Sequence, residues 1–295
     1  MINTIVKTKG ILNKYSLVAK KKFGQNFLIN DDILNQIKKL GEVKENELVI
    51  EIGPGLGNLT EYLKEYNLLL IEIDKDMINI LEERFNISNT SNITLINEDI
   101  LKIDLDDVIS ELEKKNNIKY DNVKVIANLP YYITSPIIFK LLEDSKRVKE
   151  IIAMVQEEVA DRIVARNKSK DYGVLTVLLS FWGVATKEIL VNNTSFIPAP
   201  NVTSAVVKIV KYDNIIKEIN SVDYNVFKDL VHKAFLNRRK KMLNSLYINK
   251  FKDLSKSELE ELFSKCDINI NARAEELTLQ EYVNIVKVIV EIIAK

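Results

Sequence analysis

The 295-residue sequence contains a single cysteine, Cys266, and a single histidine, His232. One cysteine cannot form an internal disulfide, and no group of Cys or His residues has the spacing of metal ligands. The sequence therefore predicts no disulfide framework and no metal site.

Long apolar runs are also missing. None reaches the length that spans a membrane, and the N-terminus lacks the continuous apolar segment of a secretory signal. The sequence has no internal repeat and no low-complexity linker. We therefore expect a cytoplasmic protein without a membrane partner, and a monomer.

Net charge is absent as well, because 42 Lys and Arg balance 42 Asp and Glu. This balance argues against a purely electrostatic nucleic-acid binder. The basic residues are nevertheless uneven, since a leader over residues 1–30 has no acidic residue. Three basic clusters stand out: Lys7, Lys9, Lys14, Lys20, Lys21 and Lys22; Arg162, Arg166, Lys168 and Lys170; and Arg238, Arg239, Lys240 and Lys241. One such run is usually a solvated face, whereas three beside one pocket would form a track for phosphates. The sequence leaves open whether they share a face.

Strand and helix patterns alternate from Leu48 to about Tyr212, which predicts a mainly parallel sheet covered on both sides. The strands are expected at 48–52, 68–73, 94–96, 123–127, 150–155, 187–191 and 204–210. After Asp213 the period becomes helical throughout, with helices expected at 223–235, 238–248, 257–266 and 279–293. We therefore predict a Rossmann-like α/β domain over residues 1–212 and a smaller all-helical domain over residues 213–295.

A glycine turn, Gly53-Pro54-Gly55-Leu56-Gly57, follows the first of these strands and precedes a helical stretch, Asn58 to Glu65. Glycine tolerates positive φ and lets a ligand approach the backbone closely. Nineteen residues beyond Gly53, Glu72 ends the next strand. A carboxylate at this position can bind both hydroxyls of a ribose.

Asn58 stands where a dinucleotide-binding turn wants a glycine or alanine for close packing under a pyrophosphate. A nicotinamide or flavin oxidoreductase is therefore a remote alternative. The segment from Glu51 to Gly57 instead resembles the E-x-G-x-G-x-G motif of methyltransferases that use S-adenosylmethionine, a cofactor with a ribose and no phosphate. After a third strand, Asp99 could accept a hydrogen bond from the adenine amine of that cofactor, or simply cap a turn.

The tetrapeptide Asn128-Leu129-Pro130-Tyr131 follows a fourth strand. The Asn128 side-chain carbonyl and the Leu129 main-chain carbonyl could each accept a hydrogen from an exocyclic amine, and Tyr131 supplies a stacking face. Pro130 fixes φ and aims these acceptors in advance. The tetrapeptide predicts a site for a planar base that bears an amine.

Taken together, the motifs resemble those of the ribosomal RNA adenine dimethyltransferases, in particular the small-subunit (16S) dimethyladenosine transferases. The likeness runs nearly end to end through the segments 22–28, 128–136, 196–200, 204–207, 235–240 and 273–275. It implies that Asn26, Leu28, Gly53, Glu72, Asp99 and Asn128 line an S-adenosyl-L-methionine site, with Gly55 shaping the loop. Phe196 would close the face of the target adenine opposite Tyr131.

The resemblance further implies dimethylation of two adjacent adenosines near the 3′ end of 16S rRNA in the small ribosomal subunit. It assigns RNA binding to Lys21, Lys22, Arg238, Arg239 and Lys240. Because the methyl sulfonium is already activated, no strong general base is required. The only histidine, His232, is near Phe235 and Arg238 in the sequence and not beside the proposed site. Methylation of a pyrimidine carbon would need a cysteine nucleophile, for which Cys266 is poorly placed.

Three other functions stay open. A DNA adenine methyltransferase could use a similar Asn-Pro-aromatic motif, and a large-subunit rRNA methyltransferase that confers antibiotic resistance would share most of the first domain. The chain could also act as an assembly factor that binds an immature subunit and for which methyl transfer is secondary. The segments 196–200, 237–240 and 273–275 favour the small-subunit enzyme over the two methyltransferase alternatives.

Overall fold

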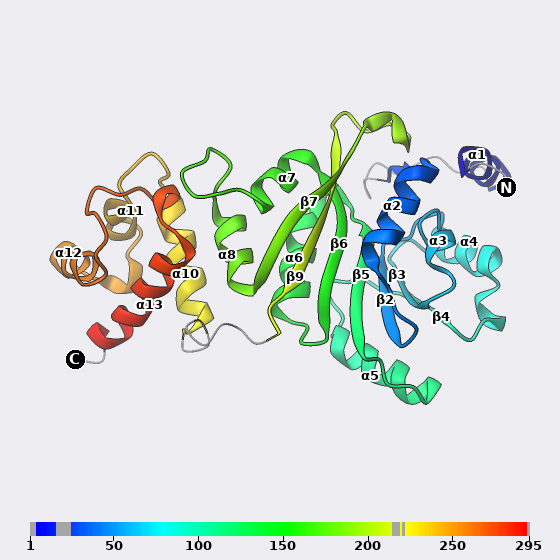
Figure 1. Cartoon of the computed structure of the whole chain (residues 1–295), viewed down its shortest axis with the longest axis horizontal. Coiled ribbons are helices and arrows are strands. Elements are labelled where there is room, and N and C mark those ends of the chain that lie inside the picture. Colours follow the sequence, from blue (N-terminus) through cyan, green and yellow to red (C-terminus); the bar gives the residue numbers. More distant parts are fainter. Residues whose placement is uncertain (1–3, 16–24, 214–218, 220–221, 294–295) are drawn as a thin grey trace. The chain divides into compact units, whose positions relative to one another are not determined.

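The computed structural model describes residues 4–15, 25–213, 219 and 222–293. The chain divides into two compact units (Figure 1). Unit 1 comprises Met1–Ala160 and Ala185–Lys211, and unit 2 comprises Asp161–Val184 and Tyr212–Lys295. Residues 161–184, which the sequence pattern groups with the sheet, thus belong to the same compact unit as the C-terminal helices.

Within the described residues, unit 1 is built on a seven-stranded sheet of order β4-β3-β2-β5-β6-β9-β7. Strands β2 to β6 pair in parallel, and β9 runs antiparallel to β6. This confirms the predicted mainly parallel sheet. The strands are β2 Glu47–Ile52, β3 Asn67–Glu72, β4 Ile93–Asn97, β5 Asn122–Asn128, β6 Val148–Gln156, β7 Gly183–Val191 and β9 Ser204–Lys211.

The central strands are continuous apolar runs because both faces of a parallel sheet are covered. Val49 of β2, Leu70 of β3, Ile126 of β5 and Ile152 of β6 are each 0% exposed. They belong to one hydrophobic cluster that also contains Leu34 from a helix packed on the sheet. This core holds the strand ends, and therefore the loops that follow them, in fixed positions.

Helices connect these strands, and several begin at a side chain that caps the first turn. Asn30, Asp74 and Asp104 each accept a hydrogen bond from a backbone N–H of the helix that they precede. The helices are α1 Thr4–Lys14, α2 Asp31–Gly41, α3 Thr60–Leu63, α4 Lys75–Phe85, α5 Leu105–Asn116, α6 Thr134–Glu143 and α7 Glu157–Ile163. The sequence analysis did not predict α1, α2 and α5.

A second, two-stranded sheet joins distant segments of unit 1. Strand β1, Phe27–Leu28, pairs antiparallel with β8, Phe196–Ile197. Short 3₁₀ turns complete the secondary structure: η2 Ile87–Asn89, η3 Tyr131–Ile133, η4 Asn193–Ser195, η5 Phe251–Asp253 and η6 Ala274–Glu276.

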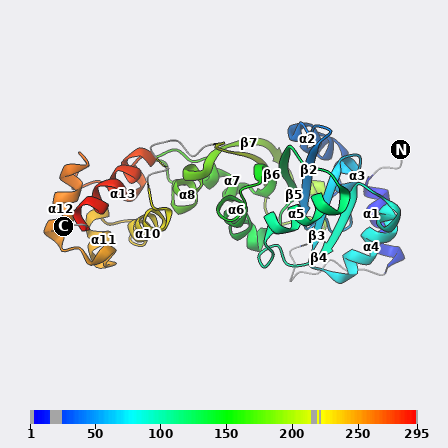
Figure 2. The same cartoon turned by 90° about the horizontal axis from the view of Figure 1, so that it is seen from below.

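In unit 2 the described helices form one group (Figure 2). Aromatic side chains pack between them. The ring of Phe227 lies 4.8 Å from that of Phe181 and 6.5 Å from that of Tyr282, measured between centroids. The helices are α8 Val174–Trp182, α10 Tyr224–Phe235, α11 Met242–Ile248, α12 Lys256–Lys265 and α13 Leu279–Ile293. None of the helices that the structure describes combines the length and apolarity required to span a bilayer.

Candidate functional site

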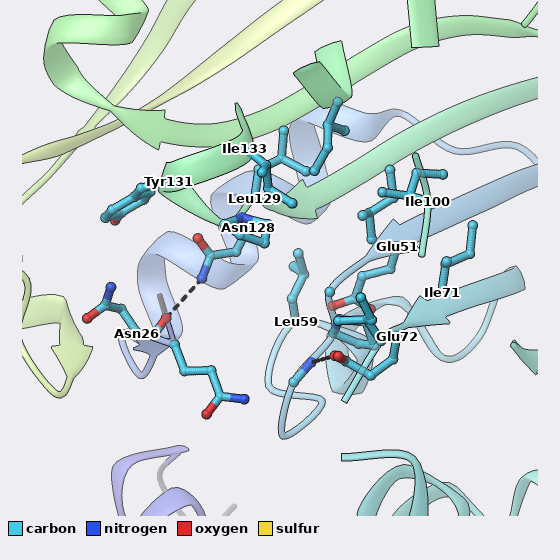
Figure 3. Close-up of a pocket in the computed structure, with 18 of the residues that line it drawn as sticks. Asn26, Glu51, Leu59, Ile71, Glu72, Ile100, Asn128, Leu129, Tyr131 and Ile133 are labelled. Carbon is cyan, nitrogen blue, oxygen red and sulfur yellow. Dashed lines mark hydrogen bonds between the residues drawn. The ribbon is translucent and has the colours of Figure 1, made fainter. Parts of the chain in front are cut away.

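The loops at the carboxyl ends of β2, β3, β4 and β5 surround a cavity in unit 1 (Figure 3). Ligands of open α/β sheets bind at this end of the strands. Ten of the predicted site residues line the cavity: Asn26, Leu28, Gly53, Gly55, Glu72, Asp99, Asn128, Leu129, Pro130 and Tyr131. Segments separated by about a hundred positions in the sequence therefore meet at one place.

The glycine turn forms one wall of the cavity. Gly53, Gly55 and Gly57 have φ of 66°, 55° and 78°, a region that residues with a side chain rarely adopt. The Gly55 N–H donates to Glu72 Oε2 at 3.0 Å (Figure 3). The turn is thereby tied to the end of the neighbouring strand.

Glu72 is held in place by the backbone around it. Its other oxygen, Oε1, accepts a hydrogen bond from the Asp74 N–H at 2.8 Å. Burial raises the pKa of this carboxyl, and the two backbone donors oppose that rise. A carboxylate fixed by two donors keeps lone pairs for a ligand hydroxyl, which agrees with the predicted contact to a ribose.

Glu51 also lines the cavity, although the sequence analysis quoted it only as part of a motif. The side chain is 2% exposed, and its Oε2 accepts a hydrogen bond from the Thr60 hydroxyl at 2.7 Å. Burial, with a smaller contribution from the nearby Glu72, raises the pKa of Glu51 to about 8. Glu51 therefore holds a proton at neutral pH.

Asp99 follows β4 and lies at the edge of the cavity. Its Oδ1 accepts a hydrogen bond from the Leu101 N–H at 3.0 Å, so Asp99 does cap a turn. One carboxylate oxygen is thus used by the chain, and the carboxylate retains further acceptor capacity for an amine. The two interpretations of Asp99 are compatible.

Asn128 is the last residue of β5. Its Nδ2 donates to the Asn26 carbonyl at 3.1 Å (Figure 3). Because the amide nitrogen is bound to the wall that carries Asn26, the amide plane is fixed and Oδ1 is kept as the acceptor. The next residue, Leu129, is 1% exposed and donates its N–H to the Met154 carbonyl at 3.2 Å. Both predicted acceptors, Asn128 Oδ1 and the Leu129 carbonyl, therefore belong to groups that hydrogen bonds hold in place.

Tyr131 lies beside these acceptors on the turn η3. Its hydroxyl forms a 2.6 Å hydrogen bond with Ser204 Oγ, and burial raises the pKa of the phenol. The bond fixes the ring edge, and burial keeps the phenol neutral. The adjacent Tyr132, which the sequence analysis did not single out, also lines the cavity and is 56% exposed.

Phe196 is not among the residues that line this cavity. It belongs to β8, is 3% exposed and packs in the core cluster of unit 1. It pairs with Leu28, which does line the cavity. Its role as a second stacking face for an adenine remains a prediction.

Two further polar residues of the cavity wall had no predicted role. The Gln25 side chain donates to Asp74 Oδ2 at 3.0 Å, and Asn58 is buried. Asn58 drew attention only because it departs from the dinucleotide motif. Asn58 is a polar residue at the start of a helical stretch, directly after the glycine turn. This position is the sequence signal that could have indicated a role for it.

The predicted RNA-binding residues fall in different parts of the chain. Lys21 and Lys22 lie outside the described residues. In unit 2, Arg238 Nη2 donates to the carbonyls of Lys170 and Tyr172, at 2.5 and 2.9 Å. The clusters at 238–241 and 166–170 are thus in contact within one unit. Arg239 and Lys240 are exposed.

Part of the basic leader is paired with acidic residues of the same unit. Lys7 lies 3.6 Å from Glu61, and Lys14 forms an ion pair with Glu83. These two lysines contribute less positive charge to an RNA surface than the sequence suggests. Burial raises the pKa of the Cys266 thiol in unit 2 to about 11, so little of this thiol is in the nucleophilic thiolate form at neutral pH.

Comparison with known families and proteins adds independent findings. The family model described as "Ribosomal RNA adenine dimethylase" matches residues 17–291. A protein of Lactococcus lactis subsp. lactis (strain IL1403), named ribosomal RNA small subunit methyltransferase A, is 41% identical over 95% of this chain and 93% of its own length. A protein of Alkaliphilus oremlandii (strain OhILAs) with the same name is 41% identical over 95% of each chain.

Solved structures with the same fold include a dimethyladenosine transferase from Plasmodium falciparum and the 23S rRNA methyltransferase ErmE. The first has a TM-score of 0.72 and 24% identity, covering 89% of this chain and 96% of that chain. The second has a TM-score of 0.62 and 20% identity, covering 89% and 98%. The chain thus shares its fold with these two methyltransferases.

Proposed function

The chain belongs to the ribosomal RNA adenine dimethylase family, and from this premise we propose that it dimethylates two adjacent adenosines near the 3′ end of 16S rRNA in the small ribosomal subunit. It is an S-adenosylmethionine-dependent rRNA methyltransferase. The observation that carries the finer proposal is the fixed pair of acceptors at Asn128 and Leu129 beside the cofactor cavity.

The residues around the cavity fit S-adenosylmethionine. Glu72, held by two backbone donors, would bind the ribose hydroxyls. Asp99 would accept a hydrogen bond from the adenine amine of the cofactor. The glycine turn allows close approach without a side chain, and Asn26 and Leu28 form the opposite wall. When bound, the cofactor supplies a methyl group that its sulfonium activates.

The chemistry of the chain is directed at the target amine. An adenine amine is a poor nucleophile because its lone pair is delocalised into the ring. Hydrogen bonds from the amine to Asn128 Oδ1 and the Leu129 carbonyl would favour the pyramidal geometry in which the lone pair is available. During methyl transfer the N–C bond would form as the C–S bond of the sulfonium breaks, leaving a neutral thioether and a positively charged amine. That amine would then lose a proton to solvent, so no strong base is needed before transfer.

Positioning supplies most of the remaining acceleration. A flipped adenine loses its stacking in the RNA, at a cost of a few kcal/mol, and Tyr131 would restore one stacking face. The Ser204 hydrogen bond orients that face before RNA arrives. Phe196 would supply the other face. It pairs with Leu28, which lines the cavity.

RNA recognition is assigned to the basic residues Lys21, Lys22, Arg238, Arg239 and Lys240. Residues 1–212 would carry catalysis, and the helical residues 213–295 would bind RNA. Support comes from the Arg238 hydrogen bonds, which join two basic clusters within unit 2. Phosphate binding of this kind gives affinity that falls as salt rises.

Methyl transfer from labelled S-adenosylmethionine tests this proposal. Small subunits that lack adenine methylation are incubated with the protein in parallel with large-subunit RNA and duplex DNA. We expect label in small-subunit RNA alone. Label in large-subunit RNA or in DNA would show that the substrate differs from the one proposed. Cofactor binding without transfer would favour the assembly-factor alternative.

A further inference from the structure

Asn58 is the centre of a buried hydrogen-bond network that reaches both walls of the cofactor cavity. The side chain is 5% exposed. Its Nδ2 donates to the Leu28 carbonyl at 2.8 Å, and its Oδ1 accepts from Arg84 Nη1 at 3.2 Å. Arg84 also donates to the Leu56 carbonyl of the glycine turn. Leu28, Leu56 and Asn58 all line the cavity, so the network sets the separation of its walls.

The second donor bond of Asn58 goes to helix α1, which does not itself line the cavity. Nδ2 donates to Thr8 Oγ1 at 2.9 Å, and Thr8 is 0% exposed. Leaving a buried amide without one of its hydrogen-bond partners costs free energy, whereas an exposed ion pair contributes little. The Thr8 hydrogen bond therefore fixes the position of Asn58 more firmly than an exposed ion pair would. Removing the Thr8 hydroxyl would leave one N–H of Asn58 unsatisfied.

Helix α1 and the residue after it also pack against one residue from each wall of the cavity, Phe27 and Leu56. Ile11, Leu12 and Tyr15 contact a buried cluster that contains Phe27 and Leu56. A Cβ atom at Gly55 would lie 3.1 Å from the Phe27 ring, so Phe27 itself presses on the glycine turn. Both views show α1 beside α4, which carries Arg84 (Figures 1 and 2). The helix therefore supports the two segments that enclose the cavity, the one with Phe27 and Leu28 and the glycine turn.

We propose that α1 is a clamp for the cofactor site, and that Thr8 and Asn58 are positioning residues for S-adenosylmethionine binding. Through Thr8 the helix fixes Asn58, and through Asn58 it fixes the Leu28 carbonyl relative to the glycine turn. This inference rests on the proposed cofactor, and it concerns residues that the proposed chemistry does not use. RNA binding is not required for it.

Thermodynamic linkage gives the clamp a quantitative signature. If docking of α1 raises the affinity for cofactor by a given factor, bound cofactor must favour the docked helix by the same factor. A helix that merely adds stability to the unit would show no such reciprocity. Backbone amides of residues 4–14 should therefore exchange hydrogen more slowly in the presence of S-adenosylmethionine.

The test compares Thr8→Val with Thr8→Ser and with Asn13→Ala, an exposed position on the same helix. Cofactor affinity is measured by calorimetry, and methyl transfer at saturating cofactor is measured separately. We expect Thr8→Val to weaken cofactor binding by about fivefold or more, the lower end of typical coupling between sites. Transfer at saturating cofactor should stay within about twofold of the parent protein, because the Asn128 acceptors are untouched. Thr8→Ser keeps the acceptor oxygen and should restore affinity.

The outcomes separate this inference from the proposed function. Failure of the parent protein to bind S-adenosylmethionine would refute the proposed cofactor itself. Normal binding by the parent and equal binding by Thr8→Val would refute the clamp. If Thr8→Val does not fold, hydrogen exchange in the parent protein decides, since unchanged exchange of residues 4–14 on cofactor binding would also overturn the clamp.

Discussion

At the scale of single residues, the hydrogen bond from Asn128 to the Asn26 carbonyl uses the half of the amide that the proposed chemistry does not need. The donor is bound by the chain, and the acceptor is kept for the substrate. Asn128→Asp would remove that donor and introduce a charge next to the Asn26 carbonyl. The geometry thus explains why an amide suits this position better than a carboxylate of the same shape.

Tyr131 offers a prediction that separates stacking from hydrogen bonding. Tyr131→Ala removes the ring and should reduce methyl transfer by more than about tenfold, since a stacking face contributes about 1–3 kcal/mol. Tyr131→Phe keeps the ring and removes only the Ser204 hydrogen bond, so its effect should be smaller. Single-turnover transfer measures both. Cofactor affinity should stay within a few-fold in each variant, and a large drop would place Tyr131 in the cofactor site instead.

Glu51 yields a prediction about pH and stability. The folded state holds this proton up to about pH 8, whereas the unfolded chain releases it near the ordinary value of 4.5. The free energy of unfolding therefore falls as pH rises through this window, by about 1.4 kcal/mol for each unit of pKa difference as an upper bound. Above pH 8 the effect is complete. Glu51→Gln should remove the dependence and be more stable than the parent protein at pH 9.

Urea unfolding at pH 6 and pH 9 measures this difference. Glu111→Gln, at an exposed position of α5, is the matched control and should follow the parent protein at both values. An equal gain from Glu51→Gln at pH 6 and pH 9 would show that Glu51 does not titrate between them.

At the scale of elements, the glycine turn between β2 and α3 is constrained by its neighbours as well as by the cavity. A Cβ atom at Gly57 would lie 2.5 Å from Phe85 Cε2, and the φ of Gly57 is 78°. Gly57→Ala should therefore destabilise unit 1 by about 2 kcal/mol or more, through backbone strain and overpacking. Gly10→Ala, in helix α1 with open space around it, should instead stabilise the protein by up to about 1 kcal/mol. Thermal unfolding of the two variants measures these changes, and a shift of the midpoint in the same direction for both would contradict the prediction.

The sequence predicted the elements whose hydrophobic pattern is regular. A predicted strand overlaps each of the seven strands of the large sheet, and the loops at the carboxyl ends of β2, β3, β4 and β5 surround the cavity. The two-residue strands β1 and β8 were beyond reach because they are too short for any period, and their pairing joins residues 27 and 197. Helix α1 has a weakly apolar face, and its role depends on the buried Thr8, which composition does not distinguish from an exposed threonine.

The site was predictable where a motif marks a strand end and unpredictable where a partner comes from far away. Glu72 and Asn128 could be placed because each ends an apolar run. The partners Thr8 for Asn58 and Ser204 for Tyr131 are 50 and 73 positions away. No local pattern indicates such pairs, which exist only after the sheet has formed.

At the scale of the whole molecule, the zero net charge conceals an uneven distribution. Some leader lysines are neutralised by acidic residues of unit 1, whereas Arg239 and Lys240 in unit 2 are exposed. Arg238 uses its guanidinium to hold the backbone at 170–172. Arg238 therefore has a different expected role from Arg239 and Lys240, and the variants should differ accordingly.

Arg239→Ala and Lys240→Ala should weaken RNA binding and reduce the salt dependence of the affinity, each by about one unit of slope if the side chain binds one phosphate. Their stability should match the parent protein. Arg238→Ala should in addition lower the stability of unit 2, because two backbone carbonyls would then have no donor from this side chain. Filter binding over a range of salt concentrations, with thermal unfolding of each variant, measures both effects. An unchanged salt slope in the Arg239 and Lys240 variants would remove these residues from the RNA surface.

The most direct test of the central claim is nucleoside mass analysis of small-subunit RNA after incubation with S-adenosylmethionine and either the parent protein or Asn128→Ala. The parent protein should produce dimethyladenosine at two adjacent positions near the 3′ end. Asn128→Ala should still bind cofactor and produce no dimethyladenosine, because the amine then loses the Asn128 acceptor and is held by the Leu129 carbonyl alone. Equal amounts of dimethyladenosine from both proteins would contradict the role of Asn128, and none from the parent protein would contradict the proposed reaction.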